Sequence, residues 1–241
     1  MNTHQQADQN LAALRANSYP GRGIVIGQTG DGARFVQVYW IMGRSANSRN
    51  RVFVQDGNVV RTAPYDESRV EDPSLIIYNC TRILDRAHIV TNGDHTDTIH
   101  DGLAGGESFE SSLHARTYEP DAPNYTPRIA GMVDLAAPVH AYQFAVLKTI
   151  DNDPSLPVRH FYAFERGMPG IGHMVTTYDG DGDPLPSFSG DPQPVPVPDS
   201  VDAALELYWS AMNADNKVSL LVKFIDPVSG ACETRITNKH D

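Results

Sequence analysis

Apolar runs separated by short polar turns cover most of the chain and predict a protein rich in β-strands. These runs are rich in β-branched and aromatic residues, which favour strands, and glycine, aspartate or proline separates many of them, as in hairpins. The predicted strands lie at residues 23–27, 35–42, 52–54, 75–84, 87–91, 129–133, 142–149, 160–164, 172–178, 218–225 and 232–237.

A few segments show apolar residues at helical spacing instead. Residues 107–118 and 201–212 predict two main amphipathic helices, and Leu11 with Leu14 indicates a short helical piece near the N-terminus. Because strands occur in runs rather than in strict alternation with helices, we expect an antiparallel, layered α+β domain. Residues 1–21 are expected to form an N-terminal extension and residues 22–241 a single domain. The proline-rich segment 184–198 is expected to be a stiff spacer on the surface.

Composition narrows the class of protein. The 241 residues are 40% hydrophobic and carry a formal net charge of −11, which favours a soluble protein and argues against binding to nucleic acid or an anionic membrane. No apolar run approaches the roughly 20 residues of a transmembrane helix, and no secretory signal is evident. The two cysteines, Cys80 and Cys232, are too few for a disulfide framework, which predicts a reducing, cytoplasmic setting. Cys80 is expected to be a buried apolar residue rather than a nucleophile.

The densest group of hydrogen-bonding side chains follows the predicted strand 87–91. Asn92-Gly93 is typical of a turn, and the carboxylate, imidazole and hydroxyl groups of residues 94–98 come directly after it. This crowding predicts a functional site. His95 and Asp97 without a third ligand do not make a metal site, so a structural or substrate-contacting function is favoured.

Two further features suggest binding or chemistry. The loop 43–51 carries three arginines in an acidic protein, and guanidinium groups bind phosphate through paired N–H donors. A solvated turn whose arginines pair with surface carboxylates is the alternative. Glu119 falls at the C-terminal end of the predicted helix 107–118, where the helix dipole disfavours a carboxylate. It therefore either has another function or simply faces solvent.

Taken in order, these motifs resemble the archaeal-type IMP cyclohydrolase family. The resemblance covers roughly residues 22–225, and its motifs are more specific before residue 140. They are Gly43-Arg44-Ser45 with Arg49, Tyr78-Asn79-Cys80, residues 92–99, Tyr118-Glu119 and residues 126–130. The chain departs from the pattern at Asp94, where relatives tend to carry serine, in its longer N-terminal extension and in the proline-rich segment.

The resemblance implies a fold, a reaction and a set of site residues. The fold would be a four-layer αββα sandwich of the N-terminal nucleophile hydrolase type, without a catalytic N-terminal nucleophile. The reaction would close the purine ring of a formamidoimidazole carboxamide ribonucleotide to give inosine monophosphate and water, with no metal or organic cofactor. The expected catalytic residues are Tyr78, Glu119 and Arg44. The expected substrate-binding residues are Arg49, Asn79, Asn92, His95, Thr96, Asp97, Thr98 and Arg128.

Two other functions remain open from the sequence. A family member could bind a purine nucleotide without turnover, or it could be an amide-bond hydrolase of the same fold, which would require processing to expose a nucleophile. Assembly into a homo-oligomer is also left open.

Overall fold

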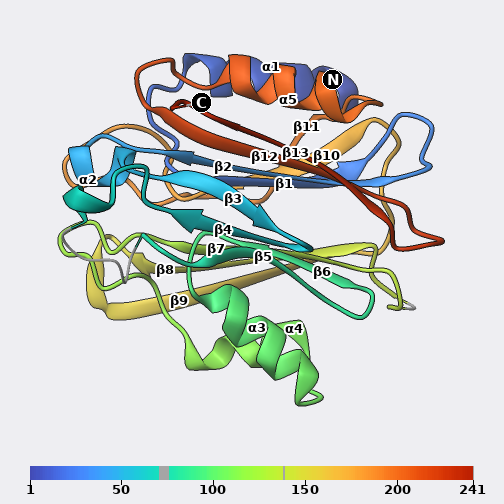
Figure 1. Cartoon of the computed structure of the whole chain (residues 1–241), viewed down its shortest axis with the longest axis horizontal. Coiled ribbons are helices and arrows are strands. Elements are labelled where there is room, and N and C mark those ends of the chain that lie inside the picture. The colour runs from blue at the N-terminus through green and yellow to red at the C-terminus, as the bar shows by residue number, and fades with distance from the viewer. Residues whose placement is uncertain (71–75, 138, 241) are drawn as a thin grey trace.

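The computed structural model of the chain describes residues 1–70, 76–137 and 139–240. Two antiparallel β-sheets lie face to face, and helices cover their outer faces (Figure 1). Within the described residues this is an α+β protein with sheets of six and seven strands and five α-helices. The predicted α+β class is therefore confirmed.

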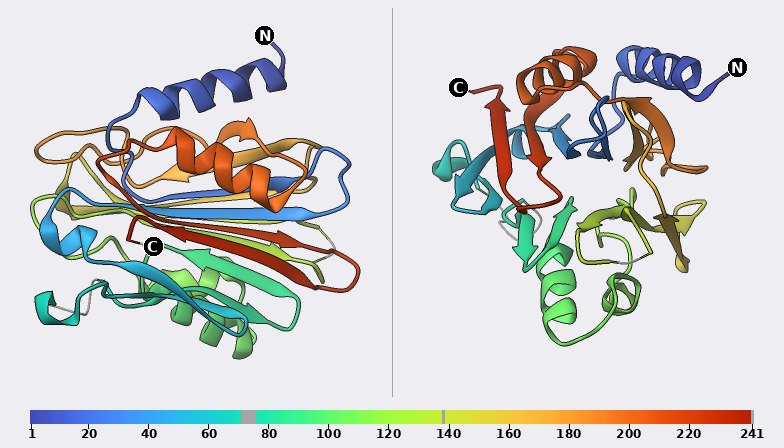
Figure 2. Two further views of the ribbon diagram at one scale, coloured as in Figure 1. Left: turned by 45° about the horizontal axis from the view of Figure 1, so that its top comes forward. Right: turned by 90° about the vertical axis from the view of Figure 1, so that its right-hand side faces the viewer.

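The six-stranded sheet has the order β11-β10-β1-β2-β12-β13. Its strands are β1 (Gly23–Gln28), β2 (Phe35–Met42), β10 (Ile171–Thr176), β11 (Gln193–Pro196), β12 (Lys217–Ile225) and β13 (Cys232–Asn238). Helices α1 (Thr3–Ala16) and α5 (Val201–Ala211) lie side by side on its outer face (Figure 2). Leu11 and Leu14 of α1 and Tyr208 of α5 pack with Trp40 and Val38 of β2 in one apolar cluster, which fixes both helices to the sheet.

The seven-stranded sheet follows the chain, in the order β3-β4-β5-β6-β7-β8-β9. Its strands are β3 (Val52–Asp56), β4 (Val59–Ala63), β5 (Asn79–Leu84), β6 (Ala87–Thr91), β7 (Arg128–Asp134), β8 (Tyr142–Ile150) and β9 (Asp153–Phe164). Its outer face carries α3 (His95–Ala104), α4 (Phe109–Ser112) and the 3₁₀ turn η2 (Leu113–Ala115), while α2 (Ala46–Arg49) and η1 (Glu67–Arg69) lie in connections. Residue 75, the first of the predicted strand 75–84, lies outside the described residues.

A second apolar cluster fills the space between the sheets. Ile24 and Tyr39 from the first sheet meet Val90 and Phe144 from the second, all fully buried. The central strands are therefore covered on both faces, by helices on one side and by the partner sheet on the other. This explains why their sequences are continuous apolar runs rather than alternating ones.

The expected single helix over residues 107–118 is wrong. Ser108 caps α4, but that helix ends at Ser112, and the 3₁₀ turn η2 follows. The longer helix in this region is α3, which begins inside the polar motif that was expected to be a turn. Its buried face includes His95 and Thr96 beside Ile99, so polar residues occupy positions where a helical pattern is normally recognised by apolar ones.

The expectation of a surface spacer at residues 184–198 is also wrong. Leu185, Phe188, Val195 and Val197 are buried, and β11 pairs with β10 at the edge of the six-stranded sheet. Proline is tolerated on an edge strand because one side of that strand has no neighbour requiring its N–H group.

Cys80 and Cys232 are both free, and Cys80 is fully buried as predicted. In the part of the chain that the structure describes, no helix has the length and apolar character needed to cross a bilayer.

Candidate active site

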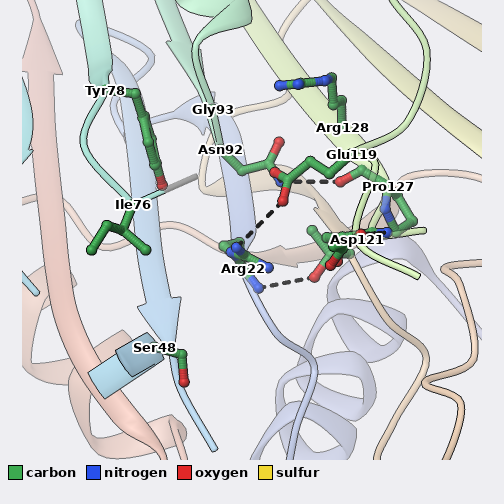
Figure 3. Close-up of polar contacts among 12 residues, drawn as sticks. Arg22, Ser48, Ile76, Tyr78, Asn92, Gly93, Glu119, Asp121, Pro127 and Arg128 are labelled. Atoms are coloured by element: carbon green, nitrogen blue, oxygen red, sulfur yellow. Dashed lines mark hydrogen bonds and ion pairs between the residues drawn. The ribbon is translucent and has the colours of Figure 1, made fainter. Parts of the chain in front are cut away.

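A group of polar residues gathers at one end of the space between the sheets, because several strands begin or end there. Arg22 directly precedes β1, Arg51 precedes β3, Tyr78 precedes β5, Asn92 follows β6 and Glu119 lies in the loop before β7. Figure 3 shows these side chains, apart from Arg51, converging from both sheets. Residues far apart in the sequence thus share one site.

Glu119 is the central acidic group of this site and is only 3% exposed. One carboxylate oxygen lies 3.7 Å from Nη2 of Arg22, and the other accepts a hydrogen bond of 3.4 Å from Nδ2 of Asn92 (Figure 3). Burial raises the pKa of Glu119 above its ordinary value, although Arg22 and Arg128 act in the opposite direction. A carboxyl group in this setting exchanges its proton closer to neutral pH than a surface glutamate does.

Hydrogen bonds to the start of β7 and to the residue before it fix the orientation of the Asn92 side chain. Its Oδ1 accepts a hydrogen bond of 2.8 Å from the Ile129 N–H, and its Nδ2 donates to the Pro127 carbonyl at 3.0 Å. The same amide nitrogen also donates to Glu119. The fully buried Asn92 therefore connects the start of β7 to the carboxylate and fixes where that carboxylate points.

Tyr78 contributes a buried hydroxyl group. Its oxygen lies 2.7 Å from the hydroxyl of Tyr39 on β2, so the pair joins the two sheets. Burial raises the pKa of Tyr78, while the neighbouring Arg51 and Arg22 guanidinium groups oppose the rise. The phenol stays neutral at physiological pH and can donate a hydrogen bond.

Arg22 and Arg51 were not predicted as site residues. Arg51 is 1% exposed, its Nε donates to the Ser48 carbonyl at 2.9 Å, and its Nη1 has no hydrogen-bond partner among the described residues. The Nε of Arg22 likewise has none within the described chain. The buried guanidinium group of Arg51 and the partly exposed one of Arg22 therefore lie near a single buried carboxylate, Glu119, so the site has an excess of positive charge and unused N–H donors.

A cavity of about 270 Å³ adjoins Arg22. It is lined by Tyr19, Arg22, Arg44, Ser45, Ser48, Asp121, Asn124, Thr126, Tyr178 and Leu185. The predicted Gly43-Arg44-Ser45 motif thus reaches the same site as Arg22. The Arg44 guanidinium lies over the Tyr19 ring, 5.0 Å from its centroid, and forms an ion pair with Asp181.

Arg128 lies on the side of the site that faces α3. Its Nη1 contacts a carboxylate oxygen of Asp94 at 2.6 Å and lies 3.3 Å from Nδ1 of His95. A Cβ atom on Gly93 would meet Arg128, His95 and Glu119, so this glycine allows the three groups to approach one another. Nε2 of His95 lies 3.0 Å from the Ile129 carbonyl, and burial lowers the pKa of His95 to about 3, so the imidazole is neutral.

The other predicted residues contact protein groups around α3 or in the loop before β3. Asn79 donates to Asp97 at 3.0 Å, and Arg82 binds the same carboxylate at 2.9 Å. The remaining three have these partners: Thr96 lies 2.6 Å from the Thr91 hydroxyl, Thr98 accepts from Arg116 at 2.9 Å, and Arg49 donates to the Gly43 carbonyl at 2.9 Å and to Asn216 at 3.0 Å. Among the described residues, Arg44 is the one predicted site residue that lines the cavity, and these five side chains do not.

Comparison with known proteins identifies the family. The model of the family described as IMP cyclohydrolase-like protein matches residues 19–230. The chain belongs to this family. It is 32% identical to the IMP cyclohydrolase of Methanopyrus kandleri over 183 residues, which cover 70% of this chain and 89% of that protein.

Two further IMP cyclohydrolases match a shorter part of this family member. The protein of Methanococcus maripaludis strain C7 is 39% identical over 116 residues, or 46% of this chain and 56% of that protein. The protein of Methanocaldococcus jannaschii is 35% identical over 119 residues, or 48% of this chain and 57% of that protein. The chain thus aligns with somewhat more than half the length of these two relatives.

Little in the sequence of this IMP cyclohydrolase-like protein marks Arg22 and Arg51 as site residues. Arg22 stands alone between Gly21 and Gly23, ahead of an apolar strand. Gly21 has a φ of 74°, in the left-handed region that glycine adopts readily. A charged residue flanked by two glycines at the start of a buried strand is the signal that could have indicated Arg22. Arg51 belongs to the three-arginine loop, but nothing distinguishes it there from Arg49.

Proposed function

We propose that the protein is an IMP cyclohydrolase, which closes the purine ring of 5-formamidoimidazole-4-carboxamide ribonucleotide to give inosine monophosphate and water. The observation that carries the proposal is the buried Glu119, held by Asn92 and Arg22 beside a cavity that Arg44 also lines, in a member of this family. The site offers a proton carrier and a set of N–H donors in a partly enclosed space, which ring closure requires.

The reaction proceeds by addition and then elimination. The carboxamide nitrogen attacks the formyl carbon, a C–N bond forms, and a proton passes from that nitrogen to the former carbonyl oxygen. The hydroxyl group then leaves as water, taking a second proton from the former formamido nitrogen as the C=N bond forms. Glu119 carries these protons, because its raised pKa allows the carboxyl to accept and release them.

Arg22 and Tyr78 act on the formyl oxygen. Negative charge develops there during the attack, and the Arg22 guanidinium beside Glu119 and the neutral Tyr78 hydroxyl are donors that could stabilise it. Burial strengthens such hydrogen bonds because the surroundings have a low effective dielectric constant. Arg128 supports the site electrostatically through Glu119.

The substrate phosphate binds at the Arg44 side of the cavity. Arg44, Ser45 and Ser48 line it together, and guanidinium and hydroxyl donors are suited to a phosphate. Arg49 donates to the Gly43 carbonyl and so helps to hold the loop that carries Arg44. Arg49 therefore supports the phosphate site through the loop rather than through a direct contact with the phosphate.

We also propose that the layered architecture is the αββα sandwich of the N-terminal nucleophile hydrolases, used without such a nucleophile. The two antiparallel sheets between outer helices support this assignment. At the start of β1 the residue beside the cavity is Arg22 rather than a cysteine, serine or threonine. An arginine there provides a donor for charge stabilisation instead of a nucleophile.

The decisive experiment follows the formamido substrate by absorbance and detects inosine monophosphate as product. Loss of substrate with matching formation of inosine monophosphate supports the cyclohydrolase. Binding of inosine monophosphate without turnover would instead identify a nucleotide-binding protein. The intact mass of the purified chain tests the amide-bond hydrolase alternative, because that function requires cleavage to expose a nucleophile.

A further inference from the structure

The cavity beside Arg22 has an acidic part as well as a basic one. Asp121, Asn124 and Thr126 line it from the loop that also carries Glu119. A carboxylate repels phosphate, so Asp121 in a cavity proposed to bind an anionic nucleotide requires an explanation. Asp121 forms no direct ion pair with any residue that the structure describes.

Asp121 is held in a fixed orientation. The Thr126 N–H donates to its Oδ1 at 2.7 Å, and the Thr126 hydroxyl donates to its Oδ2. The Thr126 oxygen in turn lies within hydrogen-bond distance of the Tyr178 hydroxyl, which can donate to it. Since each carboxylate oxygen can accept two hydrogen bonds, both oxygens of Asp121 keep acceptor capacity for a ligand.

Asn124 provides the complementary donor. Its Oδ1 accepts a hydrogen bond of 3.0 Å from the Leu185 N–H. What this side chain offers to a molecule in the cavity is therefore its amide NH₂ group. A fixed acceptor and a donor from one loop match a pair of neighbouring hydroxyl groups, each of which donates one hydrogen and accepts another.

We propose that Asp121 and Asn124 bind the vicinal 2′,3′-diol of the substrate ribose and so determine specificity for ribonucleotides. The inference rests on the proposed function. Carboxylates accept hydrogen bonds from ribose hydroxyls in other nucleotide sites. With the phosphate at Arg44 and the reacting groups at Glu119, the acidic part also fixes the direction of the nucleotide, because a reversed ligand would place its phosphate against Asp121.

The test measures binding of inosine monophosphate and of its 2′-deoxy and 3′-deoxy analogues by calorimetry. The proteins are the wild type, Asp121→Asn, and Asp153→Asn as a matched control. Asp153 accepts an N–H bond and a hydroxyl bond from Ser155, much as Asp121 does from Thr126, but it is exposed on β9 and is not among the residues lining the cavity.

The wild type and the control should bind the ribonucleotide roughly 10- to 100-fold more tightly than the deoxy analogues, the range expected for a charged hydrogen bond. In Asp121→Asn this preference should fall to within about 3-fold, mainly through weaker binding of the ribonucleotide. If Asp121 only positions the loop, all three ligands weaken equally and the preference persists, which overturns the inference. Asn124→Ala is a second test variant, and it should lose part of the preference for the ribonucleotide over the deoxy analogues.

The outcomes separate the two proposals. A wild type that closes the ring and binds inosine monophosphate but does not discriminate against the deoxy analogues contradicts the ribose site alone. A wild type that neither closes the ring nor binds inosine monophosphate contradicts the proposed function and the ribose site together.

Discussion

Buried polar groups occur at both ends of the space between the sheets, in two different settings. At one end Arg22 lines the cavity, with Glu119 and Arg51 near it. Toward the other end Gln37, His88 and Lys223 are enclosed, each at most 3% exposed. The register places Lys223 opposite Gln37 on the neighbouring strand, and Gln37 donates to the His88 carbonyl at 2.9 Å.

Both groups contain polar atoms without protein partners. Among the described residues, Nζ of Lys223, Nε2 of His88 and Oε1 of Gln37 lack hydrogen bonds, as do Nε of Arg22 and Nη1 of Arg51. At the cavity a bound substrate can supply the missing partners. In the enclosed group burial disfavours the charged forms instead, because it lowers the pKa of Lys223 to about 8 and that of His88 to about 3. Polar groups that a ligand can reach can therefore serve a function, whereas the enclosed polar groups only lower the stability of the fold.

The largest effect is expected from Glu119→Gln, which removes the proton carrier but keeps the shape and one hydrogen-bond acceptor. We expect kcat to fall about 10³-fold, within the range for general acid–base groups, while KM changes little. Steady-state kinetics measure both constants, and circular dichroism verifies folding. Activity close to that of the wild type would remove Glu119 from the mechanism and weaken the contrast between the two ends.

A smaller loss is expected from Arg22→Met, because the donor to the developing oxyanion disappears. We expect kcat/KM to fall about 10²-fold. Arg61→Met is the matched control, since Arg61 is exposed on β4 and should tolerate the change. Equal kinetics for both variants would show that Arg22 serves only packing.

At the enclosed end, Lys223→Met should stabilise the protein. Because the folded pKa of about 8 lies below the ordinary value of 10.5, the unfolded chain binds more protons between these values. The free energy of unfolding should therefore rise with pH across that window in the wild type. The variant should lose this slope and gain roughly 1–3 kcal/mol near neutral pH. Denaturant unfolding at several pH values measures this, and a destabilised variant would mean that the amine has an unseen partner.

The smallest effect is expected in the pH profile of the wild-type enzyme. Burial raises the pKa of Glu119 above its ordinary value of 4.5, and the group must be a carboxylate to accept a proton. The rate constant kcat should fall about tenfold per pH unit below that raised pKa. This fall in kcat at low pH should be absent from the residual activity of Glu119→Gln. If the variant still shows the fall, another group is responsible for it.

The sequence predicted most of the strands because their apolar runs depend only on burial. It did not predict β4, the first half of β9 or the proline-containing β11. The first five residues of β9 are exposed. Helix α3 was hidden because His95 and Thr96 occupy its buried face. In these places tertiary contacts, rather than local pattern, decide the structure.

The candidate site was predictable only in part. Tyr78, Asn92 and Glu119 lie together, and Arg44 lines the adjoining cavity. The prediction that Glu119 lies at the C-terminal end of a helix was wrong. The residue lies in a loop, where its N–H donates to the Thr126 carbonyl. Arg22 joins the site only because β1, in the six-stranded sheet, packs against the second sheet, and no local feature of the sequence encodes how the two sheets pack.

The edge strand β11 has a consequence for the behaviour of the protein at high concentration. An exposed sheet edge can recruit a strand from another molecule and so start aggregation. Pro194 and Pro196 carry no N–H group to offer such a strand. Their carbonyls are also occupied, by Asn10 of α1 and Tyr208 of α5, each at 2.8 Å. The helices that cover the sheet therefore also close this edge against further growth.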